Sequence, residues 1–263
     1  MKKKAIFFDI DGTIVDRRMQ IADSTKAAME KLHENGHCTF ICSGRSRAYI
    51  KNPELLSLKF DGIIAGCGTH VEVGGKNLVC HVIDKELLSY TWSVLKKSGI
   101  SPLWEGIEYL YGDEEGLKDD PYYRFLKTQL KENLIAIDGN VKDDWKVNKM
   151  SVVIKEDADL GAFEILKEHF HLLQHNPVVA EMVPAGFSKA TGLEAVREYL
   201  QLGTEDTYAV GDSINDLDML RAAGTGIAMG NASKEAKEAA DYVTTDIHDD
   251  GIWNAMRHFG LIS

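Results

Sequence analysis

The stretch Phe7-Phe8-Asp9-Ile10-Asp11-Gly12-Thr13 decides the fold of this chain. It predicts a buried strand that ends at two carboxylates, with a glycine turn after them. Because alternate side chains of a strand share a face, we expect Asp9 and Asp11 on the same side of the strand end. Two carboxylates about 4 Å apart repel each other by about 4 kcal/mol at an effective dielectric constant of 20. A fold tolerates such a pair if a cation lies between the two groups or if one of them keeps its proton. The alternative interpretation is that the two acids are solvated in a turn and have no chemical role.

Short apolar runs rich in β-branched residues recur along the chain and alternate with helix-like segments. The expected strands are residues 5–10, 38–42, 62–65, 207–210, 226–229 and 242–244. The expected helices are residues 21–35, 192–200, 216–223 and 234–240. Such alternation predicts an α/β fold built on a parallel sheet.

Residues 84–184 interrupt this alternation. They contain two longer helical segments, 85–98 and 158–170, and strand-like segments at 103–111, 147–154 and 172–183. With 12 Lys and Arg against 19 Asp and Glu, this part carries −7 of the net charge of −11. The pattern is typical of an α+β domain with antiparallel pairing. We therefore expect a core domain of residues 1–83 and 185–263 and an inserted domain of residues 84–184.

The composition of the chain argues against several classes of function and partner. The 263 residues are 44% hydrophobic and 27% charged, which is ordinary for a globular protein. The net charge of −11 argues against a nucleic-acid or anionic membrane partner, and no segment approaches the roughly 20 apolar residues of a membrane helix. The cysteines form no Cys-x-x-Cys motif, which favours reduced core residues of a cytoplasmic protein. They are Cys38, Cys42, Cys67 and Cys80.

Three further motifs are expected near Asp9, because open α/β sheets bind ligands beyond the carboxyl ends of their strands. The second strand ends in Ser43-Gly44-Arg45, where we expect a helix to open and its N–H groups to hold a phosphate. Another strand ends in Gly211-Asp212-Ser213-Ile214-Asn215-Asp216, and Lys189 precedes the helix before it. Singly, these are a turn, an N-cap and a solvated lysine. Together they predict a site with carboxylates for a cation and donors for an anion.

These motifs, in this order, resemble the haloacid dehalogenase (HAD) superfamily of hydrolases and phosphotransferases. The tail segments Met229-Gly230-Asn231-Ala232 and Asp250-Gly251-Ile252, and an insertion between the second and third motifs, resemble its Cof-type branch. The resemblance implies a Rossmann-like parallel-sheet core with an inserted α+β cap of type IIB. It also implies a phosphoric monoester hydrolase whose cap reads the leaving group.

The resemblance assigns roles to particular residues. Asp9 would be the nucleophile that forms an aspartyl-phosphate, and Asp11 the general acid and base. Mg²⁺ would take oxygens from Asp9, the Asp11 backbone carbonyl and Asp212, which suits a cation that prefers oxygen ligands. Around these groups, Asp216 would support the metal and Thr13 would brace the turn. The expected phosphate-binding residues are Ile10, Ser43, Gly44, Lys189 and Asn215.

Some points stay open in the sequence. Asn231 either lines the site or begins the helix after it. Cys67-Gly68 stands where many relatives have Asn-Gly, a departure that puts the inheritance of a substrate from relatives in doubt, and Ala190 stands where many have glycine. A small sugar or cofactor phosphate is the expected substrate, hydrolysed by a monomer or weak homodimer. A phosphomutase and a non-catalytic phospho-ligand sensor are the alternatives, although a pure sensor has no need for Asp11.

Overall fold

The computed structural model describes residues 2–137, 141–174 and 176–263 of the chain. The chain divides into two compact units. The core unit comprises Met1–Gly44, Lys51–Cys80 and Phe187–Ser263, and the inserted unit comprises Arg45–Ile50 and His81–Gly186. The inserted unit thus includes a short segment that follows Gly44. A domain division at residues 84 and 184 stays a prediction.

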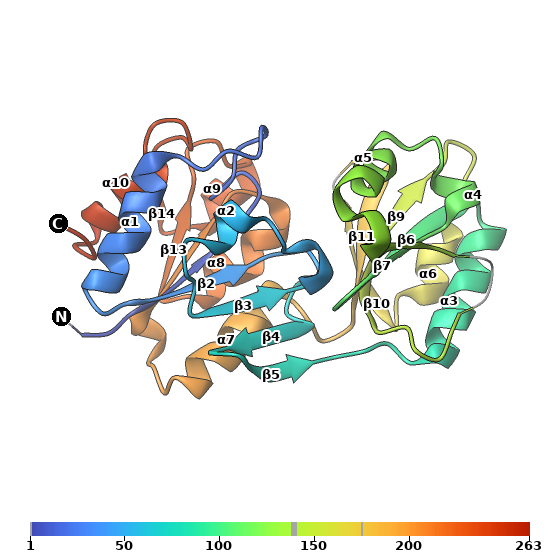
Figure 1. The fold of residues 1–263 in the computed structure, drawn as a ribbon, viewed down its shortest axis with the longest axis horizontal. Helices are drawn as coiled ribbons and strands as arrows, with labels where there is room; N and C mark the ends of the chain where they lie inside the picture. The colour runs from blue at the N-terminus through green and yellow to red at the C-terminus, as the bar shows by residue number, and fades with distance from the viewer. Residues whose placement is uncertain (1, 138–140, 175) are drawn as a thin grey trace. The chain divides into compact units, whose positions relative to one another are not determined.

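The core unit is built on an eight-stranded sheet in the order β14-β13-β12-β1-β2-β3-β4-β5 (Figure 1). The parallel strands are β1 (Ala5–Phe8), β2 (Cys38–Cys42), β3 (Gly62–Ala65), β12 (Thr207–Gly211), β13 (Thr225–Ala228) and β14 (Tyr242–Val243). The antiparallel strands β4 (His70–Val73) and β5 (Lys76–Cys80) extend one edge. The parallel-sheet α/β fold expected from the alternating sequence is confirmed.

Helices pack against this sheet in two groups. The helices α1 (Asp23–Glu34) and α10 (Gly251–His258) contact each other, and α1 also contacts β2. The helices α7 (Lys189–Tyr199), α8 (Leu217–Ala222) and α9 (Lys234–Ala239) pack in a row. A short helix, α2 (Pro53–Leu56), precedes β3. The sheet is buried between them, and the ring of Phe7 stacks on that of Phe40 at 5.1 Å between centroids. This packing holds β1 rigidly at the centre of the sheet.

The inserted unit has its own six-stranded sheet in the order β10-β11-β9-β6-β7-β8. Its strands are β6 (Ile100–Gly106), β7 (Leu110–Gly112), β8 (Leu134–Ala136), β9 (Val147–Ile154), β10 (Phe170–Gln174) and β11 (Val179–Pro184). All neighbours pair antiparallel except β7 and β8. The α+β character predicted for this part of the chain is confirmed.

Each face of the inserted sheet carries its own apolar cluster. The helices α3 (Lys85–Lys97) and α6 (Gly161–Leu166) pack through Trp92 and Leu166 against Trp104 and Met150 of the sheet. The helices α4 (Glu114–Leu117) and α5 (Pro121–Leu130) pack on the other face, where Ala48 joins the cluster. The unit therefore has a three-layer order of helices, sheet and helices.

The inserted unit departs from expectation in four places. The helix predicted for residues 158–170 ends at Leu166, because Phe170 begins β10 and pairs with Pro184. The strand predicted for residues 103–111 is two strands, β6 and β7, that pair with each other. The strand predicted for residues 172–183 is the β10–β11 hairpin, whose residue 175 lies outside the described part of the chain. The helix α5 was not predicted.

No helix among the described residues combines the length and the apolar character needed to cross a bilayer. All four cysteines are outside disulfides. Cys38, Cys42 and Cys67 are buried, as predicted, but Cys80 is exposed. The core assignment of Cys80 is wrong because it lies on β5, the edge strand of the core sheet.

Candidate active site

Three strand ends bring the predicted residues to one edge of the core sheet. The strand β1 lies between β12 and β2, parallel to both. Asp9 follows β1 directly, and its backbone N–H donates to the Val210 carbonyl at 3.0 Å. Ser43 follows β2 and donates its N–H to the Ile64 carbonyl at 2.9 Å. Asp212 follows β12. Because carboxyl ends of parallel neighbours share an edge, these three residues are neighbours at that edge.

Lys189 reaches this edge because α7 approaches the sheet very closely. A Cβ atom at Gly192 would lie 2.4 Å from Cγ2 of Ile64, so only glycine allows the approach. Ser188 caps α7 by accepting the Thr191 backbone N–H, which places Lys189 at the first helical position. Its side chain is fully buried, and Nζ lies 2.6 Å from Oδ1 of Asp9 and 2.5 Å from Oδ1 of Asp216. Lys189 therefore joins two strand ends through one ammonium group.

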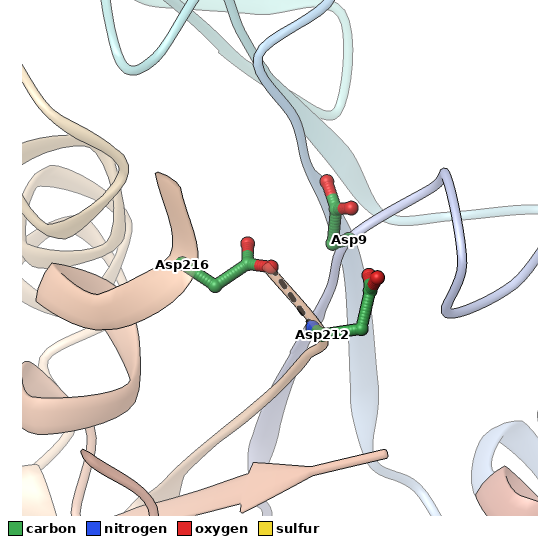
Figure 2. Close-up of side chains that lie close together, drawn as sticks. All are labelled: Asp9, Asp212 and Asp216. Atoms are coloured by element: carbon green, nitrogen blue, oxygen red, sulfur yellow. Dashed lines mark hydrogen bonds between the residues drawn. The ribbon is translucent and has the colours of Figure 1, made fainter. Parts of the chain in front are cut away.

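Asp216 holds the loop after β12 in place. Its Oδ2 accepts the backbone N–H groups of Asp212 and Ser213, each at 2.9 Å. Figure 2 shows the bond to the Asp212 amide and the carboxylates of Asp9 and Asp212 close together. The same Asp216 carboxylate thus binds the Lys189 ammonium by one oxygen and the loop backbone by the other.

The turn after Asp11 is shaped to fit Asp212. Gly12 has a φ of 82°, a backbone conformation that favours glycine. A Cβ atom there would also lie 2.3 Å from Oδ2 of Asp212, so a larger residue would clash with that carboxylate. Thr13 donates its hydroxyl to Oδ1 of Asp212 at 3.1 Å. The Thr13 hydroxyl thus joins the first turn to the loop after β12. Asp9 is buried and Asp11 is exposed.

The buried ionisable groups of the site shift one another's pKa values. Burial raises the pKa of Asp9 well above its usual range; the Lys189 ammonium opposes this shift, and the carboxylates of Asp216, Asp212 and Asp11 add to it. Burial, together with the charge of Asp216, raises the pKa of Asp212 to about 7. Burial alone would lower the pKa of Lys189, but the charges of Asp216 and Asp9 raise it well above its usual value. Lys189 therefore stays charged, while the carboxylates lack sufficient positive charge around them.

A divalent cation would supply the positive charge that these carboxylates lack. Oxygens of Asp9, Asp212 and Asp216 lie within 4.8 Å of one another, and one ammonium against three carboxylates leaves an excess of negative charge. All three groups offer hard oxygen donors, which suit Mg²⁺ or Ca²⁺ better than a softer metal. The Asp11 carboxylate is outside this group; the ligand expected from Asp11 is its backbone carbonyl.

One expectation from the sequence differs in the structure. No α-helix opens at Ser43-Gly44; the chain instead makes a bend and a single 3₁₀ turn at Arg47–Tyr49. The Ser43 N–H continues the sheet ladder, so it is not presented by a helix terminus. Asn215 lies in a second 3₁₀ turn, Ile214–Asp216, where its Oδ1 accepts the Ser213 hydroxyl at 2.8 Å. Ile10 is buried in the first turn.

Residues 6–256 match the family described as haloacid dehalogenase-like hydrolase. The chain belongs to this family. The resemblance of its motifs to Cof-type HAD hydrolases, and the fold that it implied, are confirmed. Phosphotransferases of this family use a divalent metal, in keeping with the acidic group described above.

Several relatives of this HAD hydrolase are named as phosphatases. It is 32% identical to "Putative phosphatase YkrA" of Bacillus subtilis over the whole of both chains. It is 27% identical to the 5-amino-6-(5-phospho-D-ribitylamino)uracil phosphatase YcsE of the same organism, over 98% of this chain and 96% of that one. The structure of the HAD subclass IIB sugar phosphatase BT4131 matches with a TM-score of 0.84 and 31% identity, covering 98% of this chain and all of the other. The protein is a phosphoric monoester hydrolase.

Asn231 is a residue of this HAD hydrolase whose position the sequence left open. Its Nδ2 donates to the Gly12 carbonyl at 2.7 Å, and its Oδ1 accepts the Ile247 N–H at 2.9 Å. The N-cap of α9 is Ser233, which accepts the Ala236 N–H, so Asn231 does not begin that helix. The available signal was Ser233, which directly precedes the expected helix of residues 234–240. Asn231 ties the turn after Asp11 to the loop after β14.

We expect Asn231→Ala to lower kcat about tenfold while KM changes less than about twofold, because two hydrogen bonds of about 1 kcal/mol each hold the Asp11 turn. Steady-state phosphate release measures both constants. The control is Asn254→Ala, which also removes two bonds, to Thr245 and to the Asp249 carbonyl, but none to Gly12. Equal kcat losses in the two variants would contradict the role of Asn231.

Proposed function

We propose that the protein is a Mg²⁺-dependent phosphatase that hydrolyses small phosphomonoesters through an aspartyl-phosphate on Asp9. The observation that carries the proposal is the buried ammonium of Lys189, bound to Asp9 at 2.6 Å and Asp216 at 2.5 Å beside Asp212. Phosphoryl transfer needs positioning and charge neutralisation more than covalent help. A fixed carboxylate with one ammonium and a cation site beside it supplies both.

In the first step, a carboxylate oxygen of Asp9 attacks phosphorus and the P–O bond to the organic group breaks. Lys189 holds Asp9 through Oδ1, so the nucleophile is oriented before substrate arrives. Asp11 gives its proton to the departing oxygen. The Ser43 hydroxyl, the backbone N–H groups of Ile10 and Gly44, the Asn215 amide and Lys189 are the proposed donors to the phosphoryl oxygens.

In the second step, a water molecule attacks phosphorus and the bond to Asp9 breaks. Asp11, now ionised, accepts the proton of that water. Inorganic phosphate leaves and Asp9 returns as a carboxylate. The exposure of Asp11 supports this role, because the group must meet both the leaving alcohol and solvent water.

The proposed metal is Mg²⁺, held by oxygens of Asp9 and Asp212 and by the Asp11 backbone carbonyl. When bound, it would neutralise charge on the phosphoryl group. Asp216 would support the site from its place between Lys189 and the Asp212 amide. The oxygen-only donor set supports Mg²⁺ over zinc.

We expect EDTA to reduce phosphatase activity at least about 100-fold and added Mg²⁺ to restore it, because the carboxylates then lack their counter-charge. Phosphate release in EDTA, with and without excess Mg²⁺, measures this. Mg²⁺ should also raise the melting temperature, since a ligand that binds only the native state stabilises it. The control is EDTA saturated with Mg²⁺, which should have no effect. Full activity in free EDTA would reject the metal requirement.

The proposed substrates are sugar or cofactor phosphates. Identity to the sugar phosphatase BT4131 and to the ribitylaminouracil phosphatase supports small organic phosphates of both kinds. Phosphate release from a panel of sugar, nucleotide, flavin and pyridoxal phosphates tests the proposal; a phosphomutase would instead keep the phosphate on the organic product. We further propose that the enzyme acts in the cytoplasm as a monomer or weak homodimer, without a nucleic-acid or membrane partner, as the net charge of −11 supports.

A further inference from the structure

The turn between β3 and β4 has an unusual backbone. Gly66, Cys67 and Gly68 have φ values of 57°, 53° and 87°, the longest run of left-handed residues in the described part of the chain. This conformation disfavours residues with a side chain, and Cys67 carries one. Strained backbone of this kind is concentrated at functional sites and persists only where the surrounding structure holds it. The neighbours of this turn therefore indicate what it does.

Hydrogen bonds within the turn fix its shape. The backbone N–H of Gly68 donates to the Ala65 carbonyl at 3.1 Å. Thr69 is fully buried, and its hydroxyl donates to the Gly66 carbonyl at 2.8 Å. The backbone N–H of Thr69 also donates to this carbonyl, at 3.3 Å. The turn is therefore a rigid unit at the end of β3.

One side of the turn is joined to the end of β2. The backbone N–H of Cys67 donates to the Ser43 carbonyl at 3.1 Å, and the N–H of Ser43 donates to the Ile64 carbonyl at 2.9 Å. These two bonds continue the pairing of β2 with β3 beyond the last residues of both strands. The turn is thus fixed to Ser43, a proposed donor to the phosphoryl group.

The other side of the turn packs against the start of α7. A Cβ atom at Gly68 would lie 2.2 Å from the carbonyl oxygen of Ser188 and 3.2 Å from the backbone nitrogen of Gly192. Ser188 is the N-cap of α7, and Lys189 is the first residue of that helix. Because both contacted atoms belong to the backbone, the helix itself would have to move to accommodate a side chain at residue 68.

We propose that the turn at residues 66–69 positions Lys189, and that Gly68 is the positioning residue. The turn contacts the end of β2 on one side and Ser188 on the other, so it sets where α7 begins relative to Ser43. The Lys189 ammonium reaches the proposed nucleophile at 2.6 Å, and a displacement of about 1 Å can cost about 100-fold in rate. The kinetic part of this inference rests on the proposed role of Lys189 in phosphoryl transfer.

The experiment compares Gly68→Ala with Gly75→Ala in the full chain. Gly75 lies in the turn between β4 and β5 with a φ of 79°, and a Cβ atom there would meet no described neighbour within 4 Å. Both variants place alanine at a positive φ, but only the methyl group at residue 68 meets α7. We expect Gly68→Ala to lower kcat at least about 30-fold with less than about a fivefold change in KM, and Gly75→Ala to keep kcat within about twofold. A loss of kcat in Gly68→Ala that is less than about fivefold relative to Gly75→Ala would overturn the proposal.

A spectroscopic readout reports the position of Lys189 without the reaction. Its ammonium is fully buried between two carboxylates, so its protons should exchange slowly with water and give a ¹H–¹⁵N NMR signal that Lys189→Met removes. Gly68→Ala should shift or broaden this signal, and Gly75→Ala should leave it in place. An unchanged signal in Gly68→Ala would overturn the positioning role. A changed signal together with full turnover in Lys189→Met would support the positioning role and reject the proposed role of Lys189 in the chemistry.

A milder variant, Thr69→Val, decides the question if Gly68→Ala does not fold. It removes the hydroxyl that holds the Gly66 carbonyl and keeps the shape of the side chain. We expect kcat to fall about fivefold, because the turn that positions α7 is loosened. The matched control is Thr207→Val. Thr207 is also fully buried and donates its hydroxyl to a carbonyl three residues earlier, that of Thr204, but it lies at the start of β12. Equal kcat values in these two threonine variants would overturn the proposal.

Discussion

Asp9→Asn is expected to lower kcat at least about 10⁴-fold, because an amide cannot replace the carboxylate that attacks phosphorus. The variant should fold. Lys189 keeps its bond to Asp216 at 2.5 Å, and the substitution removes one of three crowded carboxylates. We therefore expect its melting temperature without metal to equal or exceed that of the wild type. Phosphate release and thermal unfolding measure the two effects separately.

A chemical readout tests the nucleophile directly. Acid-quenched wild-type enzyme in turnover should carry the mass of one phosphoryl group on the peptide that contains Asp9, and Asp9→Asn should carry none. The matched control is Asp206→Asn. Asp206 is also buried and bound by lysine, with Lys4 Nζ at 2.8 Å, but it lies at the opposite end of β1. Asp206→Asn should lose stability and keep kcat; full turnover by Asp9→Asn would remove Asp9 from the chemistry.

The strands around Asp9 were predictable because their local and tertiary preferences agree. The strands β2 and β3 have the predicted bounds, since each is a mainly apolar run with β-branched residues that is closed by turn residues. The α6 segment misled the prediction because Ala162, Leu166 and Phe170 follow helical spacing. Phe170 is in fact held by its pairing with Pro184. At this segment the strand pairing decided the structure, although the spacing of the apolar residues is that of a helix.

The residues that form the candidate site were predictable, but the ion pairs and hydrogen bonds that connect them were not. The positions of Asp9, Lys189 and Asp212 follow from motifs at strand and helix ends. That one ammonium bridges Asp9 and Asp216 could not be read from the chain, because Lys189 and Asp9 are 180 residues apart. The Asp216 bonds to backbone N–H groups likewise depend on the shape of a 3₁₀ turn. The sequence left the position of Asn231 open because its partners, Gly12 and Ile247, lie on separate loops.

Lys189→Met is expected to lower kcat at least about 1,000-fold and to destabilise the fold by about 3–5 kcal/mol, because it leaves Asp9 and Asp216 buried without their counter-charge. The loss should depend on pH. Without the ammonium, the pKa of Asp9 in the folded protein rises further above its unfolded value of about 4, because the Lys189 charge no longer opposes the effect of burial. The folded variant then binds more protons than the unfolded chain, so its free energy of unfolding falls as pH rises above about 4. Denaturant unfolding of variant and wild type at acidic and mildly alkaline pH measures the difference.

The control for Lys189→Met is Lys4→Met, the same chemical change at the other end of β1. Lys4 is half-buried and binds Asp206, which keeps a second partner in Lys2. Lys4→Met should therefore cost less stability, and it should keep kcat, since Lys4 is remote from the strand ends that carry Asp9 and Asp212. If Lys189→Met were as stable as the wild type at mildly alkaline pH, the Lys189 ammonium would not be the charge that holds Asp9 and Asp216 together. If it kept its turnover, the proposed phosphoryl site would lose the cation that its geometry places closest to the nucleophile.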